Sequence, residues 1–234
     1  MKNNISRRRF LQQSLVGTAG LLSFPLMSSF KYSPNDTIRL GFIGLGQQAM
    51  NLMRSFKEME GVKIVAGADV YGIKRKRFEH HLREYYYKKG ENTDITTYEH
   101  YKDLLARKDI DAVVNATPDH WHALITIDAC NAGKDIYQEK PLTYTIKEGK
   151  KVVHAVRSNN RILAVGSQQR SDINFRHAVR MVRKGAIGKL EKINAYAGDY
   201  PDPYDLPIEP IPTDLNWELW LGPNPYVHYN HRLA

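Results

Sequence analysis

A glycine-rich stretch near the start of the chain has the residue types and the spacing that bind a dinucleotide phosphate. Gly44-Leu45-Gly46-Gln47-Gln48-Ala49 fits the pattern G-x-G-x-x-G/A. Gly44 permits a tight turn, Gly46 lets the backbone approach a pyrophosphate, and the small Ala49 lets a helix pack closely on the preceding strand. The N-terminus of that helix adds unpaired N–H groups and a partial positive charge.

A carboxylate follows at the position where such a site needs one. Asp69 ends the second apolar run after the glycine loop, where it can accept hydrogen bonds from the adenosine ribose hydroxyls. It can also serve as a helix cap, and the two roles are compatible. A carboxylate repels a 2′-phosphate, so Asp69 favours NAD, while Lys74 and Arg75 keep NADP open.

Other chemically capable side chains have structural alternatives. His120 and His122 form an H-x-H pair whose rings would point apart at a helix start, and no carboxylate completes a ligand set, so we expect packing and no metal site. Lys140 precedes Pro141 and, taken alone, would be a surface lysine at a turn. Cys130 is the only cysteine, which excludes an intramolecular disulfide.

The elements that carry these residues alternate between two patterns. Apolar runs typical of buried strands lie at 38–43, 62–68, 112–116, 135–138 and 162–165. Helical patterns lie at 49–59, 73–88, 98–107, 120–132 and 146–159. This alternation predicts an α/β fold with a doubly wound parallel Rossmann sheet.

The last part of the chain has a different character. A helix is predicted at 175–184 and a strand at 190–197. Five prolines between 199 and 214 then predict an extended loop, because proline is excluded from helix interiors and central strands. Two tryptophans, Trp217 and Trp220, follow closely.

The N-terminal residues predict an export signal. Ser6-Arg7-Arg8-Arg9-Phe10-Leu11-Gln12 precedes a short apolar stretch at 15–27, which is the pattern of a twin-arginine signal. The predicted location is periplasmic or exported, with retention by an uncleaved signal left open because no clear A-x-A site is present. Part of the formal net charge of +9 lies in this segment and the rest is spread along the chain, so nucleic acid is not expected as a partner.

Two further segments, taken with the glycine loop, resemble a known family. They are Asn115-Ala116-Thr117-Pro118-Asp119-His120-Trp121-His122 and Gln138-Glu139-Lys140-Pro141-Leu142. The three together resemble the Gfo/Idh/MocA family, which includes glucose-fructose oxidoreductases and inositol dehydrogenases. The resemblance covers most of the chain from Thr37 onward.

The resemblance implies roles for particular residues. Lys140 would be the catalytic residue, beside the nicotinamide, orienting or protonating the substrate oxygen. Thr117 and Pro118 would line the nicotinamide, Glu139 would join the cofactor site, and the bond before Pro141 would be cis. Arg170 follows a Gly-x-Gln-x-Arg-like stretch and would contact either cofactor or substrate, or form an interdomain salt bridge.

The resemblance also implies a second domain. Asn216–Pro223 resembles the W-x-x-W-L-G-P segment of exported members, in which Trp217 would stack on a sugar or pack in a core. We expect a twin-arginine signal and linker at 1–33, a Rossmann domain at 37–168, and at 169–234 the start of an α+β domain with a mostly antiparallel open sheet. No later Asp and His partner for Lys140 is found before Ala234, so a C-terminally truncated chain is expected.

Three classes of function follow. The first is an exported oxidoreductase that transfers hydride between a sugar, glycoside or cyclitol hydroxyl and tightly bound NAD or NADP, because the twin-arginine route carries folded, cofactor-loaded proteins. The second is an NAD-dependent glycosidase that uses transient oxidation. The third is a cofactor-binding protein or fragment without catalysis. Expected partners are a small carbohydrate substrate, the twin-arginine machinery and, at full length, further copies of the chain.

Overall fold

Short apolar runs pair side by side into one parallel sheet, as the sequence predicts. The computed structural model describes residues 37–196, 198 and 205–234, and the predicted signal lies outside this part of the chain. The six strands follow the order β3-β2-β1-β4-β5-β6. They are β1 (Ile38–Ile43), β2 (Val62–Ala68), β3 (Thr96–Tyr98), β4 (Ala112–Asn115), β5 (Asp135–Gln138) and β6 (Leu163–Val165). Every pairing between them is parallel.

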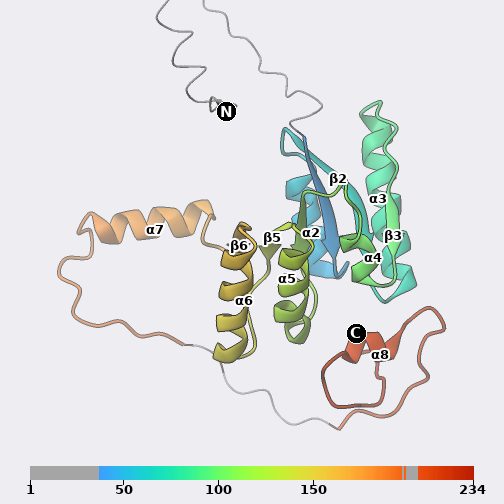
Figure 1. Ribbon diagram of the computed structural model, residues 1–234. Coiled ribbons are helices and arrows are strands. Elements are labelled where there is room, and N and C mark those ends of the chain that lie inside the picture. Colours follow the sequence, from blue (N-terminus) through green and yellow to red (C-terminus); the bar gives the residue numbers. More distant parts are fainter. Residues whose placement is uncertain (1–36, 197, 199–204) are drawn as a thin grey trace, which may run out of the picture. The chain divides into compact units, whose positions relative to one another are not determined.

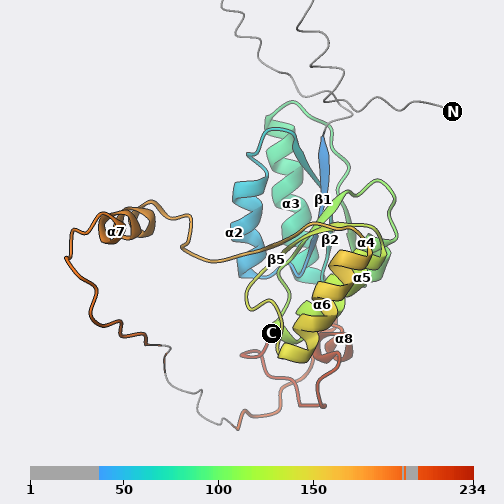
Figure 2. The same cartoon turned by 60° about the vertical axis from the view of Figure 1, so that its left-hand side comes forward.

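Helices cover both faces of the sheet, as Figures 1 and 2 show. They are α2 (Gln47–Phe56), α3 (Gly72–Lys88), α4 (Tyr101–Leu105), α5 (His122–Asn131) and α6 (Ile146–Ser158), with a 3-10 turn at Asp119–Trp121. One buried cluster packs α2 and α3 on strand residues such as Phe42 and Ile64. The other packs α4, α5 and α6 on residues such as Val65 and Val113. Each face is therefore a separate apolar layer, as expected for a doubly wound sheet.

Helix boundaries follow local chemistry. Thr145 caps α6: its hydroxyl accepts from the Glu148 N–H at 3.2 Å, and the Glu148 carboxylate accepts from the Thr145 N–H at 2.9 Å. Gly133 and Gly185 follow α5 and α7 with φ values of 75° and 79°, the left-handed conformation that glycine adopts readily at the end of a helix.

The chain order reverses at β1, which lies between β2 and β4. In open α/β sheets a ligand crevice forms outside the carboxyl ends of the strands at this switch point. The residues that follow these three strands are Gly44, Asp69 and Ala116. The sheet topology therefore gathers the glycine loop, the predicted ribose carboxylate and the loop before Thr117.

The helix predicted at 98–107 is present as the shorter α4, and the residues just before it, Thr96–Tyr98, form the edge strand β3, which the sequence does not indicate. One prediction of secondary structure is wrong. No strand forms over the described residues 190–196, which are exposed and have no partner strand within the described chain. The second-domain sheet and the boundary at 168 and 169 stay predictions.

Residues 205–234 contain one helix, α8 (Trp217–Leu221), and otherwise irregular structure. Leu215, Trp217, Leu221 and Tyr229 form a small buried cluster that packs on residues just after β2. A further helix, α7 (Ile173–Arg183), begins at Asp172, whose carboxylate accepts from the N–H groups of the first turn. Among the described residues, no helix combines the length and the apolar character that crossing a bilayer requires.

Candidate cofactor site and active site

The glycine loop joins β1 to α2 and contains two glycines with different tasks. Gly44 has a φ of 78°, and a β-carbon there would lie 2.7 Å from the backbone N and Cα of Thr117. Only glycine fits this approach of two loops. Gly46 precedes α2 with ordinary angles, and a β-carbon there would meet nothing within 4 Å. Open space therefore lies above the N-terminus of α2, where a pyrophosphate needs it.

Asp69 lies directly beside this loop. Its Oδ2 accepts from the Leu45 N–H at 2.6 Å and its Oδ1 accepts from the Tyr71 N–H at 2.8 Å. Each carboxylate oxygen has a second lone pair, which remains for a ribose hydroxyl. Asp69 thus holds the glycine loop in place and can still accept hydrogen bonds from a ligand.

Part of the basic run 74–77, in the first turns of α3, contacts the site. Arg75 donates to the Asp69 backbone carbonyl at 2.6 Å and Arg77 donates to the Leu45 carbonyl at 2.6 Å. Lys74 lines the cavity described below. The first turns of α3 therefore brace both the carboxylate and the glycine loop.

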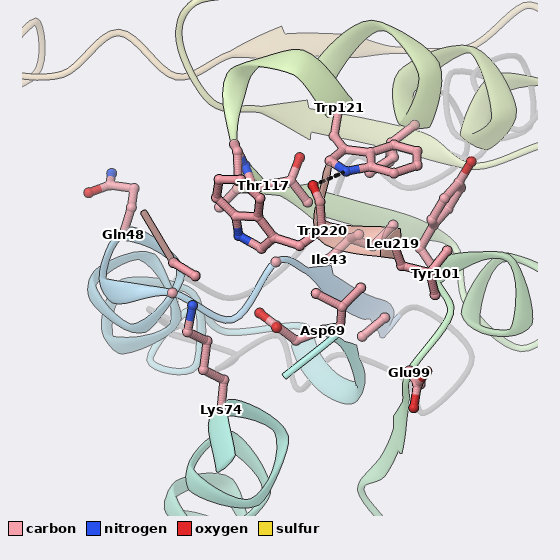
Figure 3. A pocket seen from close by; sticks show the side chains of 18 of the residues that line it. Ile43, Gln48, Asp69, Lys74, Glu99, Tyr101, Thr117, Trp121, Leu219 and Trp220 are labelled. Carbon is pink, nitrogen blue, oxygen red and sulfur yellow. Dashed lines mark hydrogen bonds between the residues drawn. The ribbon is translucent and has the colours of Figure 1, made fainter. Parts of the chain in front are cut away.

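A cavity of about 270 Å³ opens between these elements. Gly44, Gly46, Asp69, Thr117 and Pro118 line it, and Figure 3 shows Asp69 and Thr117 on opposite sides. The sequence predicts all five residues for the cofactor site. Ala49 is fully buried on the inner face of α2, where its small side chain packs among the apolar residues of that layer.

A buried polar network fixes the Thr117 loop. Asn115 Oδ1 accepts from the Thr117 hydroxyl at 2.8 Å, and Asn115 Nδ2 donates to Gln138 Oε1 at 2.8 Å. The Thr126 hydroxyl donates to the same Gln138 oxygen at 2.7 Å. Because unmade hydrogen bonds are costly in a buried site, this network ties the ends of β4 and β5 together.

Glu139 and Lys140 follow β5 at the same edge of the sheet. Glu139 is buried, its Oε1 accepts from Gln48 Nε2 at 3.0 Å, and its Oε2 accepts from the Lys140 backbone N–H at 3.1 Å. The bond between Lys140 and Pro141 is cis, as the resemblance implies. The Lys140 side chain is exposed, and neither it nor Glu139 lines the cavity.

His122 links the two loops. Its Nε2 lies 2.8 Å from the Thr117 carbonyl oxygen and its Nδ1 lies 2.6 Å from the Pro141 carbonyl oxygen. His120 Nε2 lies 2.8 Å from the Trp220 carbonyl oxygen. Both imidazoles therefore contact backbone, and the described residues contain no cluster of three His, Cys, Asp or Glu side chains able to hold a metal.

The structure does not bring the two remaining candidates to the cavity. Arg170 is exposed in a turn after β6. Trp217 is buried, donates from its indole nitrogen to the Val227 carbonyl at 2.8 Å, and does not line the cavity.

Other residues line the cavity that the sequence does not indicate. Tyr101, Trp121, Leu219 and Trp220 form its more apolar end. Burial and a hydrogen bond to Asp128 raise the pKa of Tyr101, which keeps this phenol neutral. Trp121 lies in the segment 115–122, and Leu219 and Trp220 lie in the aromatic segment 216–223, but neither segment indicates which of its side chains faces a ligand.

These features fit a nicotinamide dinucleotide. The open space above Gly46 lies at a helix N-terminus, Asp69 has lone pairs left for hydroxyl groups, and an apolar end lies beyond them.

Comparisons with known proteins agree with this geometry. Residues 38–167 match the family model described as "Oxidoreductase family, NAD-binding Rossmann fold" of the Gfo/Idh/MocA proteins. The chain belongs to the Gfo/Idh/MocA oxidoreductase family and contains its NAD-binding Rossmann domain.

The chain is similar to curated bacterial proteins. It is 28% identical over 213 residues to a glycosyl hydrolase family 109 protein of Shewanella baltica, and 28% identical over 213 residues to an alpha-N-acetylgalactosaminidase of Shewanella oneidensis. Each alignment covers 80% of this chain and 45% of the relative. The chain therefore spans less than half the length of these relatives.

Solved structures give the same fold. Myo-inositol 2-dehydrogenase from Lactobacillus plantarum superposes with a TM-score of 0.57 at 31% identity, over 65% of this chain and 43% of that one. Scyllo-inositol dehydrogenase from Lactobacillus casei, crystallised with NAD(H) and scyllo-inositol, gives 0.53 at 25% identity, over 65% of this chain and 42% of that one.

Proposed function

We propose that this protein is a nicotinamide-dependent oxidoreductase that acts on a hydroxyl group of a sugar, glycoside or cyclitol. The observation that carries the proposal is the adjacency of two loops: the Thr117 loop lines the cofactor cavity, and His122 contacts the carbonyls of both Thr117 and Pro141. This link between the two loops supports a place for Lys140 close to the bound nicotinamide.

Lys140 is the proposed acid and base of the reaction. Its ammonium group can donate a proton to the substrate oxygen or hold that oxygen in place. Bound nicotinamide would supply the hydride acceptor. The backbone of Lys140 is fixed through Glu139, which in turn accepts a hydrogen bond from Gln48 next to the glycine loop.

NAD is the proposed cofactor in preference to NADP. Asp69 supports this choice, because its carboxylate faces the cavity and would repel a 2′-phosphate. Lys74 also lines the cavity and would attract such a phosphate, so NADP remains the alternative. Titration of the protein with each nucleotide tests the choice, and tighter binding of NADP would contradict it.

A second candidate is an NAD-dependent glycosidase. The similarity to a family 109 glycosyl hydrolase and to an alpha-N-acetylgalactosaminidase favours it. Both candidates begin with oxidation of a carbohydrate hydroxyl, but the glycosidase regenerates its cofactor and releases an alcohol without net redox change. A cofactor-binding protein without catalysis is the third candidate.

One experiment separates the three. The purified protein is incubated with NAD and either inositols or a p-nitrophenyl α-N-acetylgalactosaminide, and both NADH absorbance and nitrophenol release are recorded. Accumulating NADH indicates an oxidoreductase, and nitrophenol release without NADH accumulation indicates a glycosidase. Nucleotide binding with neither product indicates the third candidate.

Lys140→Ala tests the assigned residue, with Lys147→Ala as the matched control, because Lys147 is an exposed lysine on α6. We expect Lys140→Ala to abolish turnover while nucleotide binding persists, and Lys147→Ala to behave as the wild type. Equal rates in the two variants would contradict the role of Lys140.

We also propose export by the twin-arginine route, on the strength of Ser6–Gln12. Replacing Arg7 and Arg8 together by lysine should retain the protein in the cytoplasm, whereas Arg9→Lys should not. Normal export of the double variant would contradict the proposal.

A further inference from the structure

The segment 214–222 is anchored on the chain that directly follows Asp69. The Gly72 N–H donates to the Asp214 carbonyl at 2.8 Å, and the Asn216 N–H donates to the Val70 carbonyl at 3.0 Å. Between them, Tyr71 and Leu215 form an antiparallel bridge. Backbone hydrogen bonds thus fix this segment at the end of β2, beside the carboxylate predicted to bind ribose.

The same segment has a second anchor on the far side of the switch point. The Trp220 carbonyl accepts from the Trp121 indole N–H at 3.1 Å and lies 2.8 Å from His120 Nε2. Gly222 has a φ of 55°, and a β-carbon there would lie 2.3 Å from the Trp121 ring. Contact this close requires glycine, so α8 packs tightly against the turn that follows β4.

With both anchors in place, α8 presents two side chains to the cofactor cavity. Leu219 and Trp220 line it together with Asp69 and Thr117. Figure 3 shows the Trp220 indole projecting from α8 into the cavity on the side of Thr117. Behind it, the buried Trp217 ring stacks on Trp220 with a centroid distance of 4.6 Å and an interplanar angle of 14°. Trp220 is therefore held rigidly from behind while it stays half-exposed toward the cavity.

We propose that Leu219 and Trp220 are part of the dinucleotide site and form a wall that covers the bound cofactor and slows its release. This proposal rests on the proposed function, because its occupant is the nicotinamide dinucleotide. An aromatic ring over a nucleotide contributes both stacking and exclusion of water. It also gives a protein loaded with cofactor before export a structural means of keeping it.

The test measures how fast NADH leaves the protein, using displacement by excess unlabelled NAD in a stopped-flow fluorimeter. The variants are Trp220→Ala, Trp220→Leu and Trp220→Phe. The matched control is Tyr226→Ala, an exposed aromatic residue that follows α8 and does not line the cavity. Trp220→Leu keeps an apolar contact with Trp217 and remains informative if Trp220→Ala fails to fold.

Removing the ring should accelerate release about tenfold to a hundredfold, the range expected for loss of base–aromatic stacking. The rates of NADH release from Trp220→Phe and Tyr226→Ala should stay within about threefold of the wild-type rate. Unchanged release from Trp220→Leu would overturn the proposal. Tighter binding by that variant would also overturn it, because the indole would then occupy space that the cofactor needs.

Gly46→Ala distinguishes this failure from failure of the proposed function. If the wild type binds NADH and Gly46→Ala does not, the site is established, and an unchanged release rate then refutes only the wall. If the wild type itself binds no nicotinamide nucleotide, the proposed function fails together with this inference.

Discussion

Alanine at Gly44 should mainly lower the stability of the protein, whereas alanine at Gly46 should mainly lower its affinity for the cofactor. At Gly44, alanine would adopt a left-handed conformation, which costs about 1–2 kcal/mol. Its methyl group would also lie 2.7 Å from Thr117 backbone atoms that a rotamer change cannot move away. Overpacking of this kind adds about 1–3 kcal/mol. Gly44→Ala should therefore lower the free energy of unfolding by about 2–5 kcal/mol.

Gly46→Ala should leave the fold nearly unchanged. The backbone angles at Gly46 suit any residue, and no atom lies within 4 Å of the added methyl group. Because alanine is a poorer N-cap than glycine, we expect a loss of about 0.5–1 kcal/mol. The methyl group would nevertheless enter the space above the α2 N-terminus, so NADH affinity should fall at least about tenfold, roughly 1.4 kcal/mol.

Urea denaturation followed by tryptophan fluorescence measures the first quantity, and titration with NADH measures the second. Wild-type affinity in Gly46→Ala would refute the assignment of that space to the pyrophosphate. Wild-type stability in Gly44→Ala would refute the close packing of the glycine loop on the Thr117 loop.

Three further substitutions test the packing around the site. Tyr86→Phe should cost about 1–3 kcal/mol, because the buried Ile64 N–H then loses its acceptor. Burial raises the pKa of Tyr86 to about 12. The stability that the neutral phenol of Tyr86 contributes is therefore complete below pH 10 and is lost as the pH rises toward 12. Denaturation curves at pH 9 to 12 should show that Tyr86→Phe loses less stability at alkaline pH than the wild type does. A hydrogen bond from Arg107 lowers the pKa of Asp109, so the stability that this ion pair contributes is present above about pH 4 and is lost on acidification. Because the pair is half-exposed, the free energy of unfolding of Asp109→Asn should differ from that of the wild type by no more than about 1 kcal/mol at pH 7. In acid the two proteins should be equally stable. Gln138→Leu leaves buried donors without an acceptor and should cost about 1–3 kcal/mol by urea denaturation, and a neutral result would contradict the structural role of that network.

The cofactor loop could be predicted from the sequence because its chemistry is local. Gly44, Gly46 and Ala49 lie close together in the sequence, and each has a local role in the turn, in the approach of the pyrophosphate or in the packing of α2 on the sheet. Asp69 follows a strand whose apolar run is unambiguous. Such features depend on residues that are neighbours in the sequence, so they can be predicted without knowledge of the tertiary structure.

The apolar end of the cavity could not be predicted, because it depends on contacts between distant segments. Trp220 reaches the cavity only through the pairing of Leu215 with Tyr71 and the packing of Gly222 on Trp121. Nothing in the spacing of the aromatic segment distinguishes Trp220 from Trp217, which the structure buries. The edge strand β3 could not be predicted for a similar reason, because only its pairing with β2 makes the three residues Thr96–Tyr98 a strand.

The most direct test of the central claim is to identify the nucleotide that the protein carries. The protein is purified from the cytoplasm without added nucleotide and denatured, and the released small molecules are identified by mass spectrometry, with NAD and NADP titrations in parallel. We expect release of NAD(H), or of NADP(H), at about one molecule per chain. Release of neither, together with no binding of either on titration, would contradict the assignment of the cavity between Gly46 and Asp69 as a dinucleotide site.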